Sequence, residues 1–421
     1  MQRTFYPGWW QVAIALLMQA VAAASVFTAY SIIAVPLKAE FQPSNMVLMF
    51  GLTITSLASG ILSPLLGSAI DRYSIRSLMM VGAGLISCGF FALSFAGSMN
   101  QVVIIYGLCM APATVLLGPI AGSALLSRWF TQRRGLALGI AASGGAVGGL
   151  ILPPLMQTLM GGFDWRIALK IYSGLLFLIT CPTILLFVVD RPEKINVQVE
   201  GATISTEPKS AIARTAKLTS QDILLHPTFW VIALILGTLF AGPMAVVSNM
   251  MQLADTKGIA AVEAAFLISV LSGANFGGKL ICAAIIDRAS LRVVLAVMLS
   301  ALGLSMLGMQ QAHNYPLMMA MALLGGLASG GAVPVWSLVL SRVYGPARIG
   351  QVMGVMTFVI MPFTLLSPPI FGRVFDQTGS YDFAFFGYLA LLLFTLMWLT
   401  RLRVTPLQRG EAELAPQSNP T

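Results

Sequence analysis

The sequence predicts an all-α membrane protein in which twelve transmembrane helices form two homologous six-helix bundles. Three observations predict this fold class. Only 9% of the 421 residues are charged, against about 25% in a soluble domain, and 57% are hydrophobic. Twelve apolar runs have spanning length, and short polar motifs of the first half recur in the second. The composition excludes an ordinary soluble protein, because so apolar a chain would expose large hydrophobic patches in water.

The twelve apolar runs are each long enough to cross a bilayer, which takes about 20 residues. They cover approximately residues 10–37, 46–70, 77–97, 101–127, 135–159, 167–189, 228–253, 262–286, 292–311, 316–341, 348–372 and 382–402. The first run is too long for the apolar core of a cleaved signal peptide, so we expect it to stay as a helix. The long polar stretch after the sixth run sets the expected domains: an N-terminal bundle over 1–189, a linker over 190–227, a C-terminal bundle over 228–402 and a tail over 403–421.

The basic residues indicate the orientation, because Lys and Arg in short loops are retained in the cytoplasm. With the N-terminus inside, 18 of the 24 basic residues lie on the cytoplasmic side, five lie outside and one lies within a span. We therefore expect both termini to be cytoplasmic. Because the basic residues are scattered between apolar runs, the net charge of +9 does not indicate nucleic-acid binding.

Internal repetition relates the two halves of the chain. Residues 70–76, IDRYSIR, recur as residues 286–292, IDRASLR, at an offset of 216. The Ser-Arg pair at 127–128 and Arg134 recur at 341–342 and 348, at an offset of 214. Prolines at 119 and 153–154 recur at 334 and 368–369, at an offset of 215. Agreement among these offsets predicts a duplicated bundle, as in many transporters.

Lys279 is the one ionisable side chain that we place inside a span, where a charge is costly and marks a functional candidate. It lies eight residues before Asp287, a depth of about 12 Å. A side chain that merely reaches for the headgroups is the alternative, and it covers that distance poorly. Asn275 lies four residues earlier on the same helix face. Because a lysine attracts carboxylates as a point charge, both residues are candidates for substrate binding.

Proton coupling lacks an evident carrier in the sequence. All 15 acidic residues and both histidines fall in loops, the linker, tails or helix ends. Three alternatives follow: Lys279 itself changes protonation, the substrate enters protonated, or one anion is exchanged for another.

Signals for enzymatic activity are absent from the sequence. It contains no HExxH, GxxxxGK[ST] or GxSxG motif and no paired carboxylates within a span. Neither catalysis nor ATP-driven pumping is supported, and we expect no cofactor and no metal. The four cysteines lie in apolar runs without metal-ligand spacing and are expected to pack as small hydrophobic residues.

The two halves, the linker and the Asp-Arg-x-x-x-Arg motif after the second and eighth runs resemble the major facilitator superfamily across essentially the whole chain. Residues 67–76 resemble its loop motif between helices 2 and 3, with Ser74 in place of the usual glycine. Gly67 would let helices 2 and 11 approach, and Asp71 would accept hydrogen bonds from a helix end or pair with an arginine. The resemblance implies a gating motif of Gly67, Asp71, Arg72, Arg76, Asp287, Arg288 and Arg292. The alternative is that these charges only anchor the loops in the cytosol.

A narrower resemblance is to the monocarboxylate transporters and their bacterial oxalate/formate antiporter relatives. It rests on residues 128–148, on Pro7-Gly8-Trp9-Trp10 and on residues 375–381. In that family the region of Lys279 resembles an Asp four residues before an Arg, a pair associated with anion binding and proton coupling. Asn275 and Lys279 differ from that pair at both positions, and Asn275 cannot ionise.

Helices 1, 4, 7 and 10 line the central path in this superfamily, so polar or aromatic residues on them are further candidates for substrate binding. We expect this of Tyr30, Asn249 and Trp336, with interhelical packing as the alternative for each. We also expect the Gly242-Pro243 pair to break helix 7.

The expected function is secondary active transport by a monomer in the lipid of the cell inner membrane. The substrates are small organic anions, monocarboxylates first, taken up with protons by alternating access. One alternative is an anion exchanger or an exporter of amphipathic or aromatic compounds. Another is a transporter-like receptor that binds a ligand without moving it.

Overall fold

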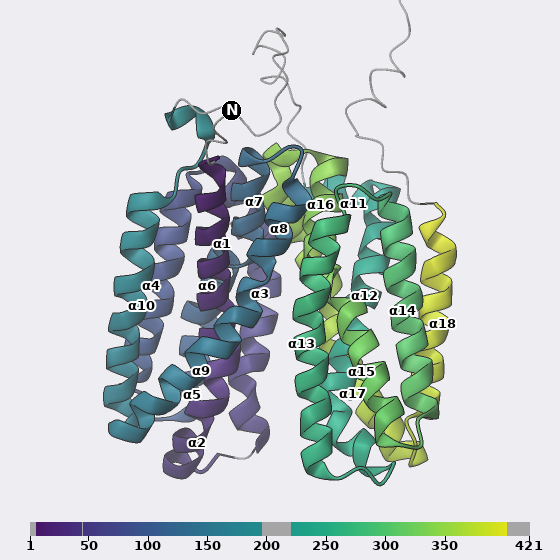
Figure 1. Ribbon diagram of the computed structural model, residues 1–421. Helices are drawn as coiled ribbons and strands as arrows, with labels where there is room; N and C mark the ends of the chain where they lie inside the picture. Colours follow the sequence, from purple (N-terminus) through teal and green to yellow (C-terminus); the bar gives the residue numbers. More distant parts are fainter. Residues whose placement is uncertain (1–5, 44, 196–219, 402–421) are drawn as a thin grey trace, which may run out of the picture.

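Two groups of long helices stand side by side in the computed structural model (Figure 1). The structure describes residues 6–43, 45–195 and 220–401, which contain helices and no strand. Twelve segments are long and apolar enough to cross a membrane, which confirms the predicted fold class. Residues 196–219 of the expected linker and the expected tail, 403–421, lie outside the described residues.

The first group contains spans 1 to 6. They are built from α1 (Gly8–Ala23), η1 (Ala24–Thr28) and α2 (Ala29–Phe41); α3 (Asn45–Arg72); α4 (Ile75–Leu93); α5 (Met99–Ile105), η2 (Tyr106–Met110), α6 (Ala111–Leu117) and α7 (Pro119–Trp129); α8 (Arg134–Ala142) and α9 (Gly144–Gly162); and α10 (Trp165–Phe187). The elements η1 and η2 are π-helical turns within spans 1 and 4.

The second group contains spans 7 to 12. They are α12 (Pro227–Asp255), α13 (Ala261–Ile285), α14 (Leu291–Gln311), α15 (Tyr315–Gly330) with α16 (Ala332–Tyr344), α17 (Ile349–Thr378) and α18 (Asp382–Leu399). Shorter helices lie between spans: η3 (Pro192–Ile195), α11 (Ser220–Leu225) and η5 (Pro346–Arg348). The basic face is the end of the molecule where α1 begins and α18 ends, and the opposite face is the other end (Figure 1).

The repeated motif places a serine cap in each half. Ser74 is the N-cap residue just before α4, and its Oγ accepts a hydrogen bond from the Ser77 amide at 3.3 Å. Ser290 begins α14 and accepts from the Val293 amide at 3.3 Å. Such caps satisfy backbone donors that a helix start leaves without an intrahelical partner. Ser74, which stands where the family motif usually has glycine, therefore stabilises the start of α4 as its N-cap.

Span 7 is not broken at Gly242-Pro243, so the expected break is wrong. The helix α12 runs through Pro243 without interruption. Side chains of neighbouring helices bond two carbonyls close to the proline: Tyr388 donates to the Thr238 oxygen at 2.5 Å and Ser367 donates to the Ala241 oxygen at 2.9 Å. Side chains on adjacent helices can support a proline within a membrane helix in this way.

A polar cluster on the opposite face, the N-terminal tie, joins the ends of spans 1, 3 and 6. Glu40, near the end of α2, forms a bidentate ion pair with Arg166 of α10, with N to O distances of 2.8 and 2.7 Å. The Trp165 indole donates to the same carboxylate at 2.9 Å, and Arg166 also donates to the Ala96 carbonyl at 3.1 Å. The tie therefore connects three helix ends within one bundle.

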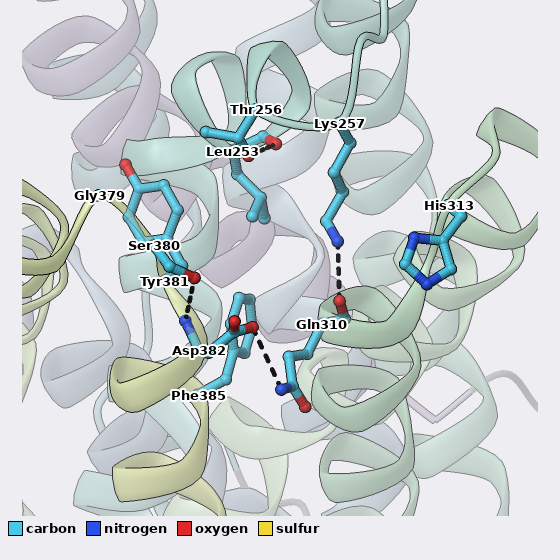
Figure 2. Close-up of a pocket in the computed structure, with 10 residues that line it drawn as sticks. All are labelled: Leu253, Thr256, Lys257, Gln310, His313, Gly379, Ser380, Tyr381, Asp382 and Phe385. Carbon is cyan, nitrogen blue, oxygen red and sulfur yellow. Dashed lines mark hydrogen bonds between the residues drawn. The ribbon is translucent and has the colours of Figure 1, made fainter.

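The C-terminal tie connects the corresponding ends of spans 7, 9 and 12. Lys257 donates to the carbonyls of Gln310 and Ala312 at 2.7 and 2.9 Å, and the Gln310 amide donates to Asp382 at 3.2 Å. Figure 2 shows these groups around a polar pocket of about 450 Å³. An ammonium at the carbonyl end of a helix also interacts favourably with the helix dipole. In the N-terminal tie the acidic residue ends the first span of the half and the basic residue begins the last span, and in the C-terminal tie this order is reversed.

We predict that Glu40→Gln lowers the thermal stability of the protein at neutral pH more than in acid. The hydrogen bond from Arg166 holds the pKa of the Glu40 carboxyl below its usual range. Such a group stabilises the fold above its unfolded pKa, about 4.3, and loses this contribution as the pH falls through its folded pKa. The difference in Tm between wild type and variant in detergent should therefore shrink below about pH 4. A pH-independent difference would contradict this assignment.

Candidate functional site

The first contact that closes the basic face between the two bundles is the Asp71 latch. Asp71, at the end of α3, accepts hydrogen bonds from the Gly350 amide at 2.9 Å and the Gln351 amide at 2.6 Å. These amides belong to the first turn of α17, where unpaired backbone donors and the helix dipole favour a carboxylate. One turn earlier, a Cβ on Gly67 would lie 2.1 Å from the Gly350 oxygen. Glycine at position 67 thus permits the close approach of spans 2 and 11.

The Asp287 latch is the repeat-related counterpart on the other side of the interface. Asp287 follows α13 and accepts from the Gly135 and Leu136 amides of α8, at 2.9 and 3.0 Å. A Cβ on Gly139 would lie 2.1 Å from the Cβ of Ala283. The same carboxylate-to-helix-start geometry therefore joins span 2 to span 11 and span 8 to span 5.

The arginines expected in the gating motif have different surroundings. Arg72, Arg288 and Arg292 are exposed at the basic face. Arg76 stays within the first bundle, where its guanidinium donates to the Leu185 carbonyl and its amide donates to Asp190 at 2.9 Å. Asp71 was expected to bond either a helix end or an arginine. In the structure its hydrogen-bond donors are the amides at the start of α17.

We predict that Asp71→Asn and Asp287→Asn each shift the protein away from the state closed at the basic face. Losing a charge-assisted bond of this type costs about 1.5 kcal/mol, roughly a tenfold change in the conformational equilibrium. Electron spin resonance distances between labels on the basic ends of the two bundles would measure the shift. Asp164→Asn is the matched control, because Asp164 caps α10 within a single bundle. A shift of equal size in the control would contradict the latch role.

The Pro-Gly-Trp-Trp segment at the start of span 1 packs against the beginning of residues 128–148, the loop between spans 4 and 5. The Tyr6 hydroxyl donates to the Trp129 carbonyl at 2.9 Å. Trp9 and Phe130 pack edge to face with ring centroids 5.1 Å apart, and a Cβ on Gly8 would lie 3.1 Å from the Phe130 ring. These contacts give the Pro-Gly-Trp-Trp segment a role in holding the loop after span 4.

Lys279 lies on α13 between the two bundles. It is partly buried, and among the residues that the structure describes its ammonium has no hydrogen bond or ion pair. A Cβ on Gly139 of span 5 would lie 3.4 Å from the Lys279 carbonyl oxygen, and one on Gly330 of span 10 would lie 2.9 Å from its amide nitrogen. These contacts place the backbone of Lys279 between spans 5 and 10, and an ammonium without a counter-ion on a membrane span favours an anion as its partner.

Asn275 lies one turn from Lys279 and donates to the Ser329 hydroxyl at 3.1 Å. This bond fixes the amide against span 10 and leaves its oxygen free to accept. Trp336, on α16, is 6% exposed, and its indole nitrogen has no hydrogen-bond partner in the structure. Its ring packs edge to face on Phe240 of span 7, with centroids 6.1 Å apart. The second bundle therefore contains two donor groups, those of Lys279 and Trp336, that have no acceptor among the described residues.

The other two expected site residues contribute to packing. Tyr30 is 1% exposed and packs edge to face on Tyr106 inside the first bundle, with centroids 4.9 Å apart. Asn249 donates to the carbonyls of Ala245 and Pro368 at 2.9 and 3.3 Å, and so connects spans 7 and 11. The structure does not bring Tyr30 and Asn249 together with Lys279 in a described contact.

Two six-span bundles that meet through repeat-related carboxylate latches, with the backbone of Lys279 packed where they meet, have the arrangement of a membrane transporter made of tandem halves. The sequence model described as Major Facilitator Superfamily matches residues 15–310 and 278–419. The chain belongs to this superfamily, and it is a multi-pass membrane transporter rather than an enzyme.

Curated relatives are named as monocarboxylate transporters. Monocarboxylate transporter 12 of Mus musculus is 28% identical over 369 residues, covering 80% of this chain and 74% of the relative. Monocarboxylate transporter 11 of Homo sapiens is 28% identical over 335 residues, covering 76% and 67%. Monocarboxylate transporter 13 of Rattus norvegicus is 27% identical over 398 residues, covering 92% and 87%. These similarities agree with the narrower resemblance of the sequence.

Solved structures with the same fold include two transporters of this superfamily. The proton:xylose symporter XylE, bound to 6-bromo-6-deoxy-D-glucose, matches with a TM-score of 0.73 at 13% identity, over 97% of this chain and 99% of that chain. The transporter FucP in the outward conformation matches with a TM-score of 0.66 at 16% identity, over 93% and 98%. At these identities the likeness establishes the fold.

Proposed function

We propose that this protein is a secondary active transporter of small organic anions, chiefly monocarboxylates, that works by alternating access. The observation that carries the proposal is Lys279, whose backbone lies where the bundles meet and whose ammonium has no counter-ion among the described residues. A substrate carboxylate would supply the missing charge, and such sites at the interface between repeats are usual in secondary transporters. The names of the curated relatives support a monocarboxylate as the anion.

Within this proposal, Lys279 binds the carboxylate and Asn275 orients it from the same helix face. The indole of Trp336 is a further donor, while Tyr30 and Asn249 act through the packing of the helices around the site. The gating motif acts through the Asp71 and Asp287 latches. From the excess of basic residues we further propose that the basic face lies in the cytoplasm. The membrane we propose is the cell inner membrane, with the protein as a monomer.

The direction of coupling that we propose is uptake with protons. Among the described residues, carboxylates lie at helix ends and loops, as Glu40, Asp71 and Asp287 illustrate. The proton would therefore travel with the substrate or on Lys279. The same placement favours a second candidate, anion exchange, because exchange needs no proton carrier.

Counterflow into proteoliposomes separates these functions. Purified protein would be reconstituted with internal unlabelled lactate, pyruvate, oxalate or benzoate, and uptake of the labelled anion would be followed with and without an inward proton gradient. Symport requires that the gradient alone drives accumulation, and exchange requires the internal anion. Failure of every anion to move, while uncharged or cationic amphipathic or aromatic compounds move, would contradict the proposal.

A further inference from the structure

Ser123 and Ser337 contact each other across the interface between the bundles. Their Oγ atoms lie 2.7 Å apart, and the two side chains are 3% and 1% exposed. Ser123 belongs to α7 of span 4 and Ser337 to α16 of span 10. They are 214 residues apart in the sequence, the offset that also relates Ser127 to Ser341. The two serines therefore occupy the same position in the repeat.

A contact between equivalent positions has a geometric consequence. A two-fold rotation moves an atom by twice its distance from the axis, so two equivalent atoms in contact lie on either side of the axis, each within half their separation. In a protein built from two parallel repeats of this type, that axis runs along the membrane normal between the bundles. The serine pair therefore lies on the central line of the molecule, where a transported solute has to pass.

The depth of the pair follows from its neighbours. Gly330 packs against the backbone of Lys279, and Ser337 follows seven residues later along span 10, about 10 Å toward the basic face. One turn beyond Ser337, the Ser341 hydroxyl receives a hydrogen bond from Arg134 at 3.4 Å. The pair thus separates Lys279 from the charged groups of the basic face.

We propose that Ser123 and Ser337 form the innermost gate of the transport path, on its axis between Lys279 and the basic face. A hydrogen bond between two neutral hydroxyls is weaker than the charge-assisted latches, so it can part and re-form in each cycle. Ser337 also donates to the Val333 carbonyl at 3.2 Å, which keeps its hydroxyl satisfied when the pair separates. This inference rests on the proposed function only for the identity of the solute that passes the gate.

Cysteine cross-linking tests the gate. The four native cysteines are free and would first be replaced by alanine. In Ser123→Cys/Ser337→Cys, oxidation should form a disulfide, reduce counterflow at least tenfold, and let a reductant restore it. The matched control is Thr238→Cys/Thr395→Cys, because these hydroxyls are 3.1 Å apart and buried within one bundle. The control disulfide should leave counterflow within about twofold of the reduced protein.

A second readout does not depend on the substrate. With Lys279→Cys added, a membrane-impermeant maleimide should reach position 279 from the basic face in the reduced protein and fail to reach it once the serine pair is cross-linked. Unhindered labelling or normal counterflow in the cross-linked protein would overturn the gate. So would failure to cross-link while the control pair does so readily. If no anion is transported by any variant, the labelling result still decides the gate, and only the proposed substrate class fails.

Discussion

Replacing Lys279 by glutamine is expected to weaken the apparent affinity for a transported monocarboxylate by about 30-fold or more. The side chain keeps much of its length but loses the charge that faces no counter-ion in the structure. Truncating one partner of a buried charge pair costs about 2 to 5 kcal/mol, since the other charge is then left unpaired. Concentration-dependent counterflow of the labelled anion would measure the loss.

Two further variants make this prediction specific. Lys279→Arg should retain at least part of the uptake, because the charge remains and a guanidinium can bind a carboxylate with two hydrogen bonds. Lys257→Gln is the matched control: Lys257 is also partly buried, but its ammonium bonds two carbonyls in the C-terminal tie. Equal losses in Lys257→Gln and Lys279→Gln would point to a loss of folding rather than of binding.

A valine at position 354 should stop transport by preventing closure at the basic face. A Cβ on Gly354 would lie 2.1 Å from the Ser63 carbonyl oxygen and 3.1 Å from the Cα of Pro64. These are backbone atoms of α3, so spans 2 and 11 would have to move apart. We expect a cost of at least about 3 kcal/mol to the closed state, a shift of more than about 100-fold in its population.

The control for Gly354→Val is Gly174→Val in α10. Gly174 is exposed, and a Cβ placed there would have no neighbour within 4 Å. Counterflow and the spin-label distances at the basic face should therefore stay near wild type in the control and change in Gly354→Val. Wild-type transport in Gly354→Val would show that the close approach of spans 2 and 11 is not needed for the cycle.

The fold was largely predictable, because spanning helices and repeats leave strong traces in composition and spacing. A helix start was one of the two partners expected for Asp71, and the Gly350 amide at the start of α17 is the partner found. The break expected at Pro243 was wrong: α12 continues through the proline, and Tyr388 and Ser367, from distant parts of the chain, hold this part of the helix through its carbonyls. Sequence alone did not show those contacts.

The positions of individual site residues were harder to predict. Which face of span 1 carries Tyr30 inward depends on the π-helical turn η1 just before it, which changes the angular position of every later side chain. Asn249 and Trp336 both carry N–H donors, yet among the described residues only Asn249 has hydrogen-bond partners, because Pro368 and Tyr381 face it. The serine pair had a signal that could have found it, the same offset of 214 that relates Ser127 to Ser341.

The two ties on the opposite face bear on how the protein is made. Glu40 meets Arg166 only after 126 further residues have been synthesised, and Asp382 belongs to the last span. Each tie joins the first span of its half to the last one, so neither can form before its bundle is complete. The N-terminal tie can therefore form in the membrane once span 6 has been made, before the second half of the chain has been synthesised. The C-terminal tie forms separately, after span 12.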